Sequence, residues 1–235
     1  AHMPGTKGKG STPTMLASML SNCGLKIGLY TSPHLVDIRE RIQINGEMIS
    51  QADFCRLVRQ VEPIVSRMRP TPTFFDVLTA MAFKWFAEQK VELAVVETGL
   101  GGRLDSTNVI TPLLSVITNI GLDHTNLLGS TYELIATEKA GIIKPNVPVV
   151  IGEMQNETRI IFLEKAKKEN AEIIFAEENF TAVKKESEEK EYLPVDVIRN
   201  TVTPSLLREG ALGVSSLHLD LTGNYQLKNI VTVIT

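Results

Sequence analysis

Residues 5–12 read Gly-Thr-Lys-Gly-Lys-Gly-Ser-Thr, and apolar side chains follow at helical spacing over residues 14–22. Glycines let backbone N–H groups turn inward around phosphate oxygens, and the positive end of the helix dipole lies at the same place. Lys9 supplies a positive charge for the β- and γ-phosphates of a nucleotide, and a hydroxyl group after it can approach Mg²⁺. The stretch therefore predicts a phosphate-binding loop at the start of a helix. The alternative is a flexible Gly/Lys turn.

The loop departs from the strict P-loop pattern G-x-x-x-x-G-K-[ST]. Met3 stands where the pattern has its first glycine, and Gly10 follows Lys9 where the pattern has Ser or Thr. Phosphate binding is still the favoured interpretation, because the glycines, the lysine and the start of a helix are all present.

Short apolar runs alternate with helical periodicity along the rest of the chain. Strands are predicted over residues 26–30, 93–96, 114–117, 147–151 and 173–175, and helices over residues 50–68, 73–89, 131–140 and 157–169. This alternation predicts an α/β, P-loop NTPase-like fold, with a mostly parallel sheet and helices on both faces. Towards the C-terminus, residues 217–221 predict a small β element and residues 226–234 begin a helix, while the charged run 184–191 predicts a solvated loop.

The composition indicates a folded chain with a real core. Of the 235 residues, 43% are hydrophobic and 22% are charged, and 24 basic against 27 acidic side chains give a formal charge of −3. No cluster of Lys and Arg is present, which argues against nucleic acid as the main partner. No apolar run approaches the roughly 20 residues that span a bilayer. We therefore expect a cytoplasmic protein with no nucleic-acid partner and no membrane contact, with a monomer as the default state.

The two cysteines, Cys23 and Cys55, are too few for a disulfide framework. Both lie in helical patterns, so they are predicted to be buried free thiols.

A carboxylate ends the apolar run 91–97, and the glycine-rich stretch 98–105 follows it. In open parallel sheets, ligands bind beyond the carboxyl ends of the strands, which is where Glu97 is expected. A carboxylate at that place can hold Mg²⁺ beside a nucleotide. An ordinary surface glutamate before a glycine-rich turn is an equally good interpretation of Glu97 alone.

Asp123 and His124 follow the predicted strand 114–117 and are expected at the same edge of the sheet. That position favours a functional His124 over a purely structural one, with Asp123 as a residue that orients it. Lys139 lies in the predicted helix 131–140, and its pattern alone indicates an ordinary exposed helix lysine.

Five strings of residues, in this order and at this spacing, resemble the folylpolyglutamate synthase/dihydrofolate synthase family of the Mur ligase superfamily. They are GTKGKGST (5–12), LYTSPHLVDIRERI (29–42), VVETGLGGRLDSTN (95–108), NIGLDHTNLLG (119–129) and ATEKAGIIKP (136–145), and LTGNYQLKN (221–229) is similar to a further family element. The resemblance covers nearly the whole chain. It implies a ligase that uses ATP to join L-glutamate to the carboxylate of dihydropteroate or of a reduced folate, through an acyl phosphate.

The resemblance also implies a set of site residues. ATP would be held by Thr6, Gly8, Lys9, Gly10, Ser11, Thr12 and Asn229. Ser32 and Glu97 would hold one Mg²⁺, and Glu97, His124 and a carbamylated Lys139 would hold a second. Lys9, His124 and Lys139 would act in catalysis, and Thr73, Leu104, Asp105 and Ser106 would contact the pterin side of the acceptor.

Three departures from the family pattern bear on function. Lys7 replaces the usual asparagine and adds a second cation to the loop, while Pro13 is tolerated in a first helical turn. Residues 1–235 correspond to a central ATP-binding domain without most of the family's first strand and without its C-terminal, glutamate-binding domain. Two alternatives stay open: a Mur-type ligase that acts on a muramoyl precursor, and a nucleotide-binding module that has lost catalysis.

Overall fold

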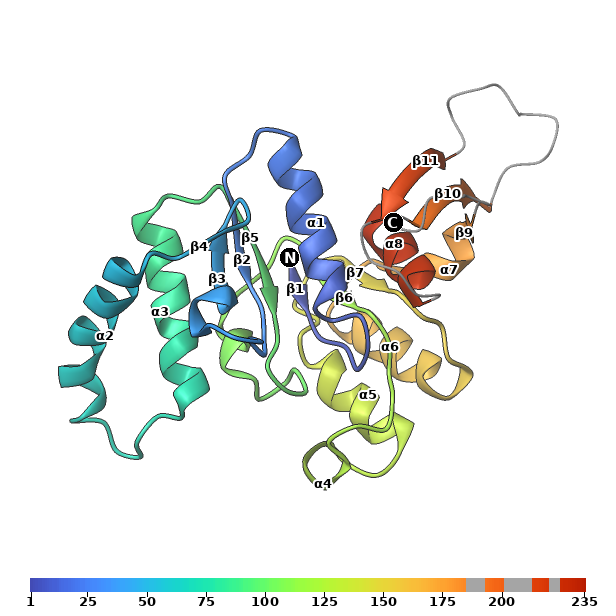
Figure 1. The fold of residues 1–235 in the computed structure, drawn as a ribbon. Coiled ribbons are helices and arrows are strands. Elements are labelled where there is room, and N and C mark those ends of the chain that lie inside the picture. The colour runs from blue at the N-terminus through green and yellow to red at the C-terminus, as the bar shows by residue number, and fades with distance from the viewer. Residues whose placement is uncertain (185–192, 201–212, 220–224) are drawn as a thin grey trace.

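The computed structural model describes residues 1–184, 193–200, 213–219 and 225–235. Within them, an eight-stranded sheet carries helices on both faces, and a three-stranded sheet stands beside it (Figure 1). The strands of the large sheet lie in the order β4-β3-β2-β5-β1-β6-β7-β8. Their bounds are β1 (His2–Met3), β2 (Ile27–Tyr30), β3 (Ile42–Ile44), β4 (Glu47–Met48), β5 (Leu93–Glu97), β6 (Ser115–Ile117), β7 (Val149–Ile151) and β8 (Ile173–Phe175).

The short strand β1 lies at the centre of the large sheet and pairs in parallel with both β5 and β6. The chain leaves β1, crosses over to β2 beyond β5, and later returns to β6 on the other side of β1. The loop after β1 therefore sits at the point where the winding direction of the sheet reverses, which is where α/β sheets bind ligands. Strands β3 and β4 pair antiparallel with their neighbours, and the sequence pattern did not predict this hairpin.

Successive residues of the parallel strands face opposite sides of the sheet and are buried on both. In β6, Val116 packs in a cluster with helices α1 and α8, whereas Ile117 packs in a cluster with α5 and α6. In β5, Val95 joins the first of these clusters and Val96 joins a third with α2 and α3. This two-sided burial explains why the strands read as continuous apolar runs.

The helices are α1 (Ser11–Asn22), α2 (Gln51–Val65), α3 (Phe74–Glu88), α4 (Thr125–Leu128), α5 (Tyr132–Ala140), α6 (Asn156–Lys168), α7 (Ala176–Asn179) and α8 (Tyr225–Ile234), with short 3₁₀ helices η1 (Ile38–Arg41) and η2 (Ser106–Val109).

Local caps set the starts of the predicted helices. The Ser50 hydroxyl accepts a hydrogen bond from the Asp53 amide at 3.0 Å and begins α2, at the start of the helix predicted over residues 50–68. Thr73 begins α3 in the same way. Helix α1 begins at Ser11, three residues before the start of the predicted range 14–22.

The smaller sheet is antiparallel and consists of β9 (Phe180–Lys184), β10 (Leu193–Arg199) and β11 (Gly213–Leu219). Strand β11 lies at its edge, which confirms the edge strand predicted over 217–221 as far as Leu219. Val195 and Val197 of β10 are buried in the cluster that also holds Ile230 of α8. Apart from Lys184, the charged run 184–191 lies outside the described residues.

The expected burial of the two cysteines is wrong, because both are exposed free thiols. Cys23 follows the last turn of α1 as its C-terminal cap, and Cys55 lies on the outer face of α2, whose buried residue is Leu57. Among the described helices, none combines the length and the apolarity that crossing a membrane requires.

We expect Phe162→Ala to lower the free energy of unfolding by about 3–5 kcal/mol, because it removes a buried ring and leaves a cavity. Phe162 on α6 is 1% exposed and packs in the cluster of Ile117 and Ile151. Ile160 lies on the same helix with 57% exposure, and Ile160→Ala should cost less than about 1 kcal/mol. Urea denaturation followed by circular dichroism measures both. Equal losses of unfolding free energy in the two variants would contradict an α6 that buries Phe162 and exposes Ile160.

Candidate active site

The predicted phosphate loop connects the carboxyl end of β1 with the start of α1. Gly8 has a φ of 72°, and a side chain at this position would collide with the amide of Asn229. The Asn229 amide in turn donates to Gln226 at 2.8 Å, and Gln226 donates to the Ser11 hydroxyl at 3.3 Å. The glycine therefore lets α8 pack against the loop, and Asn229 and Ser11, which lie 218 positions apart in the numbering, share one hydrogen-bond network.

Residues after β6 hold the first half of the phosphate loop. The Asn119 side-chain oxygen accepts the amides of Thr6 and Lys7 at 3.1 and 2.8 Å. The Thr118 hydroxyl donates to the Lys7 carbonyl at 2.8 Å, and the Thr6 hydroxyl accepts from the Gly121 amide at 2.9 Å. Thr6 therefore anchors the loop through both its amide and its hydroxyl. The sequence carries no local signal for this role of Asn119, because its partners on the loop are remote in sequence.

Glu97 ends β5 and is only 1% exposed. One carboxylate oxygen accepts the Ser32 amide at 2.9 Å, whereas the other is buried with no hydrogen-bond donor among the described residues. Burial raises the pKa of Glu97 to about 7, and the Ser32 amide and the charges of Lys9 and Arg41 oppose this rise. A buried carboxylate oxygen without a donor is suited to a cation.

Lys139 is buried, so its interpretation as an exposed helix lysine is wrong. It lies in the last turn of α5, where Ile135, Ala136 and Ala140 pack into the core. Its ammonium nitrogen donates to the Gly5 carbonyl at 2.9 Å. Burial, and then the charge of Lys9, lower the pKa of Lys139 to about 8. Lys139 lies on the buried face of α5. The apolar periodicity of this helix is too weak to predict that face from the sequence.

His124 begins the short helix α4 with a left-handed backbone, at φ 50°. The Asp123 carboxylate accepts the His124 amide at 2.8 Å, and its other oxygen lies 3.7 Å from the ring nitrogen Nε2. Both side chains are about half exposed. Asp123 thus fixes the backbone of His124 and faces its ring, which agrees with an orienting role.

The residues predicted on the acceptor side are tied together by two carboxylates. Asp76 accepts the Ser106 hydroxyl at 2.6 Å and the Thr73 amide at 2.7 Å, and these bonds hold the pKa of Asp76 below its usual value. Asp105 accepts the Leu100 amide at 2.8 Å and the Thr107 amide at 3.0 Å. Asp105 therefore shapes the glycine-rich turn that follows β5.

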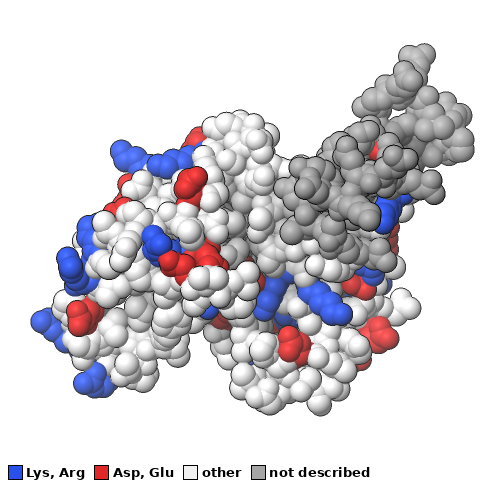
Figure 2. Space-filling view, viewed as in Figure 1, with Lys and Arg blue, Asp and Glu red and all other residues white. Residues whose placement is uncertain are grey.

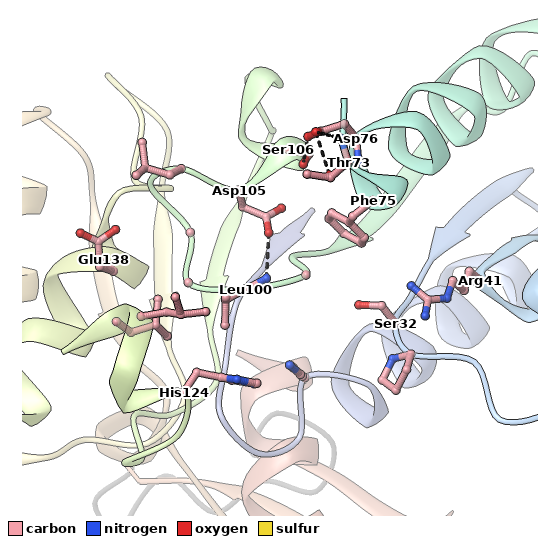
Figure 3. Close-up of a pocket in the computed structure, with 18 residues that line it drawn as sticks. Ser32, Arg41, Thr73, Phe75, Asp76, Leu100, Asp105, Ser106, His124 and Glu138 are labelled. Atoms are coloured by element: carbon pink, nitrogen blue, oxygen red, sulfur yellow. Dashed lines mark hydrogen bonds between the residues drawn. The ribbon is translucent and has the colours of Figure 1, made fainter. Parts of the chain in front are cut away.

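These elements surround one pocket of about 730 Å³ (Figure 3). The molecular surface is hollowed between the start of α3 and the α4 region, and charges of both signs are interspersed on this face (Figure 2). Seven predicted site residues line the pocket: Lys9, Ser32, Thr73, Leu104, Asp105, Ser106 and His124. A small cavity next to it is bordered by Thr6, Lys9, His124 and Lys139.

The other predicted residues lie off the pocket wall. Asn229 contacts the loop at Gly8, on α8, and Thr12 is buried with its hydroxyl unpaired among the described residues. Arg41 and Phe75 line the pocket, although sequence analysis did not select them. Arg41 was part of a quoted string, but nothing in its spacing distinguishes it from the neighbouring Arg39.

The donors present fit Mg²⁺ bound together with a nucleotide. Across the described ranges, no group of three or more His, Cys, Asp and Glu side chains could hold a metal alone. Mg²⁺ usually takes one or two protein carboxylates and completes its shell with phosphate oxygens and water. The unpaired oxygen of Glu97, beside Ser32 and the phosphate loop, matches that requirement.

Comparison with known proteins places this geometry in a family. The model of the Mur ligase middle domain matches residues 4–235. The dihydrofolate synthase/folylpolyglutamate synthase of Bacillus subtilis is 42% identical over 223 residues, which are 89% of this chain and 52% of that protein.

Two solved structures are similar along almost the whole chain. Mycobacterium tuberculosis folylpolyglutamate synthase, complexed with ADP and AMPPCP, is 34% identical with a TM-score of 0.84, over 99% of this chain and 52% of that one. An FPGS–AMPPCP–folate complex is 34% identical with a TM-score of 0.88, over 99% of this chain and 55% of that one. The chain thus spans about half the length of the relatives it matches. Since the family model covers nearly the whole chain, the protein belongs to the Mur ligase middle-domain family.

Proposed function

We propose that this domain binds ATP with Mg²⁺ and activates the carboxylate of a folate-type acceptor, which is then joined to L-glutamate. One observation carries the proposal: a phosphate loop and a buried carboxylate with an unpaired oxygen meet beside a single pocket. Nucleotide complexes of similar proteins, with ADP and AMPPCP, support the ATP part. The names of the relatives and a folate complex support the acceptor class.

The reaction would proceed in two transfers. An oxygen of the acceptor carboxylate attacks the γ-phosphorus, and ADP leaves; the amine of glutamate then attacks the acyl carbon, and phosphate leaves. A carboxylate needs this activation because its oxygen is a poor leaving group until it is phosphorylated. Positioning and charge neutralisation then supply most of the catalysis of the first step.

The predicted residues of the loop, the metal site and the acceptor wall take distinct roles in this scheme. Lys9 and the loop amides hold the phosphates, Ser32 and Glu97 hold one Mg²⁺, and Glu97 with His124 and Lys139 holds a second. When bound, Mg²⁺ neutralises the charge that develops on the transferred phosphoryl group. Thr73, Leu104 and Ser106 lie on the wall that the acceptor would contact, and Asp105 keeps the glycine-rich turn in place for it.

Lys139 is proposed to act as a carbamate. Carbamylation requires the neutral amine, and the lowered pKa of about 8 makes that form more abundant near neutral pH than it is for an ordinary lysine. The product replaces an ammonium group by an anionic oxygen ligand beside the phosphate loop.

The complete activity belongs to a longer protein in this proposal, since the chain spans about half of its relatives. Residues 1–235 would be its central ATP-binding domain, and a C-terminal domain would bind glutamate. The partners would be the small molecules ATP, pteroate or folate, and L-glutamate, with a cytoplasmic location and a monomer expected as before.

The product formed by the intact protein tests this function. The protein is given Mg-ATP and L-glutamate with dihydropteroate or tetrahydrofolate, and products are read by mass spectrometry. We expect a gain of one glutamate on at least one acceptor. A gain only on a muramoyl precursor would instead identify a Mur-type ligase. Tight ATP binding without ADP formation would identify a module that has lost catalysis.

Lys9→Ala should reduce ATP turnover in the intact protein at least a hundredfold, because it removes the charge placed for the β- and γ-phosphates. Lys7→Ala serves as the comparison, since Lys7 is exposed and its backbone, not its side chain, is bonded to Asn119 and Thr118. Its effect should stay within about threefold. ADP release measures both variants, and unchanged turnover in Lys9→Ala would remove the phosphate-binding argument.

Lys139→Ala should lose activity, and short carboxylic acids should restore part of it by supplying the missing anionic ligand. Lys139→Arg keeps a cation that cannot be carbamylated, so it should be as inactive as the alanine variant and should not respond to added acids. Initial rates with and without acetate make the comparison. Full activity in Lys139→Ala would show that no carbamate is needed here.

A further inference from the structure

The acidic side chains of the pocket wall are bonded to protein donors, which leaves positive charge available to a ligand. All three acidic residues of the wall, Asp76, Asp105 and Glu138, already accept hydrogen bonds from protein donors at 2.6–2.9 Å. The basic residues of the wall are Lys9 and Arg41. Because Lys9 belongs to the phosphate loop, Arg41 is the cation that the proposed nucleotide site does not use.

Arg41 is held in a fixed position at the end of η1. Its carbonyl accepts the Thr31 amide at 3.1 Å, and its Nε donates to His34 Nδ1 at 2.9 Å. Its guanidinium carbon lies 5.8 Å from the centre of the Phe74 ring. Its two terminal nitrogens have no hydrogen-bond partner among the described residues. The planar end of the side chain is thus positioned while its donors stay available.

Arg41 also lies near the reacting end of the pocket. It stands beside Ser32, on the opposite side of the pocket from Glu138 (Figure 3). Its charge and that of Lys9 both act on the carboxylate of Glu97. A ligand whose activated carboxylate faces Lys9 therefore has a second cation within reach, on the wall formed by η1.

We propose that Arg41 binds the second carboxylate of a folate-type acceptor, the one that is not activated. The inference rests on the function proposed above. A pteroate carries one carboxylate, which must face the nucleotide to be phosphorylated. A folate ends in a glutamate residue with two, so one can be phosphorylated while the other accepts both terminal nitrogens of Arg41, a bidentate geometry that arginine favours. Arg41 thus distinguishes an acceptor with a glutamate tail from one without it.

Steady-state kinetics of the intact protein test this assignment, with tetrahydrofolate and dihydropteroate as separate acceptors. Arg41→Gln should raise the KM for tetrahydrofolate about ten- to a hundredfold, the usual effect of losing hydrogen bonds between charged groups. The KM for dihydropteroate should stay within about threefold. A rise of equal size for both acceptors, or no rise for tetrahydrofolate, overturns the proposal.

Arg39→Gln is the matched control. Arg39 lies on the same 3₁₀ helix, loses the same charge, and is bound to Asp37 at 2.7 Å away from the pocket wall. Its substitution should change neither KM by more than about threefold. A selective loss for tetrahydrofolate in this variant would mean that overall charge, and not the Arg41 contact, explains the effect.

If Arg41→Gln does not fold, Arg41→Lys provides a second test, because lysine keeps the charge and most of the packing on Phe74. It should show a smaller rise in KM, still confined to tetrahydrofolate, and an equal rise for both acceptors overturns the proposal. Equilibrium binding of folate and of pteroate, with AMPPCP present, separates the two hypotheses. If the wild type binds both but joins glutamate to neither, the ligase function fails, while the folate-to-pteroate ratio of dissociation constants still decides the role of Arg41.

Discussion

The carboxamide of Asn119 makes the contact that orders the first half of the predicted phosphate loop. Ordering a loop with three glycines costs conformational entropy, because glycine loses more backbone freedom on ordering than any other residue. The Asn119 oxygen captures two successive amides of the loop, at Thr6 and Lys7. This contact fixes the loop relative to β6 and so relative to His124, which follows the same strand. Candidate site residues from two distant parts of the chain are thereby held together.

The candidate site holds two buried ionisable groups whose charges a bound ligand can compensate. Glu97 has a raised pKa and an unpaired oxygen, and Lys139 has a lowered pKa, and burial is the main cause of both. Burying the charged form of a carboxylate or an amine costs free energy. A cation beside the carboxylate and an anion beside the amine offset that cost. A metal–nucleotide complex carries both signs. The site is therefore suited to the pair more than to either component alone.

Patterns of neighbouring residues predicted much of the fold. Features that depend on contacts between distant residues could not be predicted from the sequence. The α/β class followed from apolar runs, and the place of α2 followed from helical spacing over residues 50–68. Six site residues on motif strings, together with Thr73, do line one pocket. The burial of Lys139, the exposure of Cys55 and the role of Asn119 were missed, because each depends on what a helix or a loop packs against after the chain has folded.

The central place of β1 ties the site to the order in which the chain becomes structured. His2 pairs with residues of β5 and β6, and Thr6 meets Asn119 across a sequence separation of 113 residues. Contacts of this length form late, because the closing of so large a loop must precede any gain from the contact. During synthesis β1 therefore stays unpaired until β5 and β6 have been made. The loop between β1 and α1 is therefore fixed only after β6 and Asn119 have been synthesised.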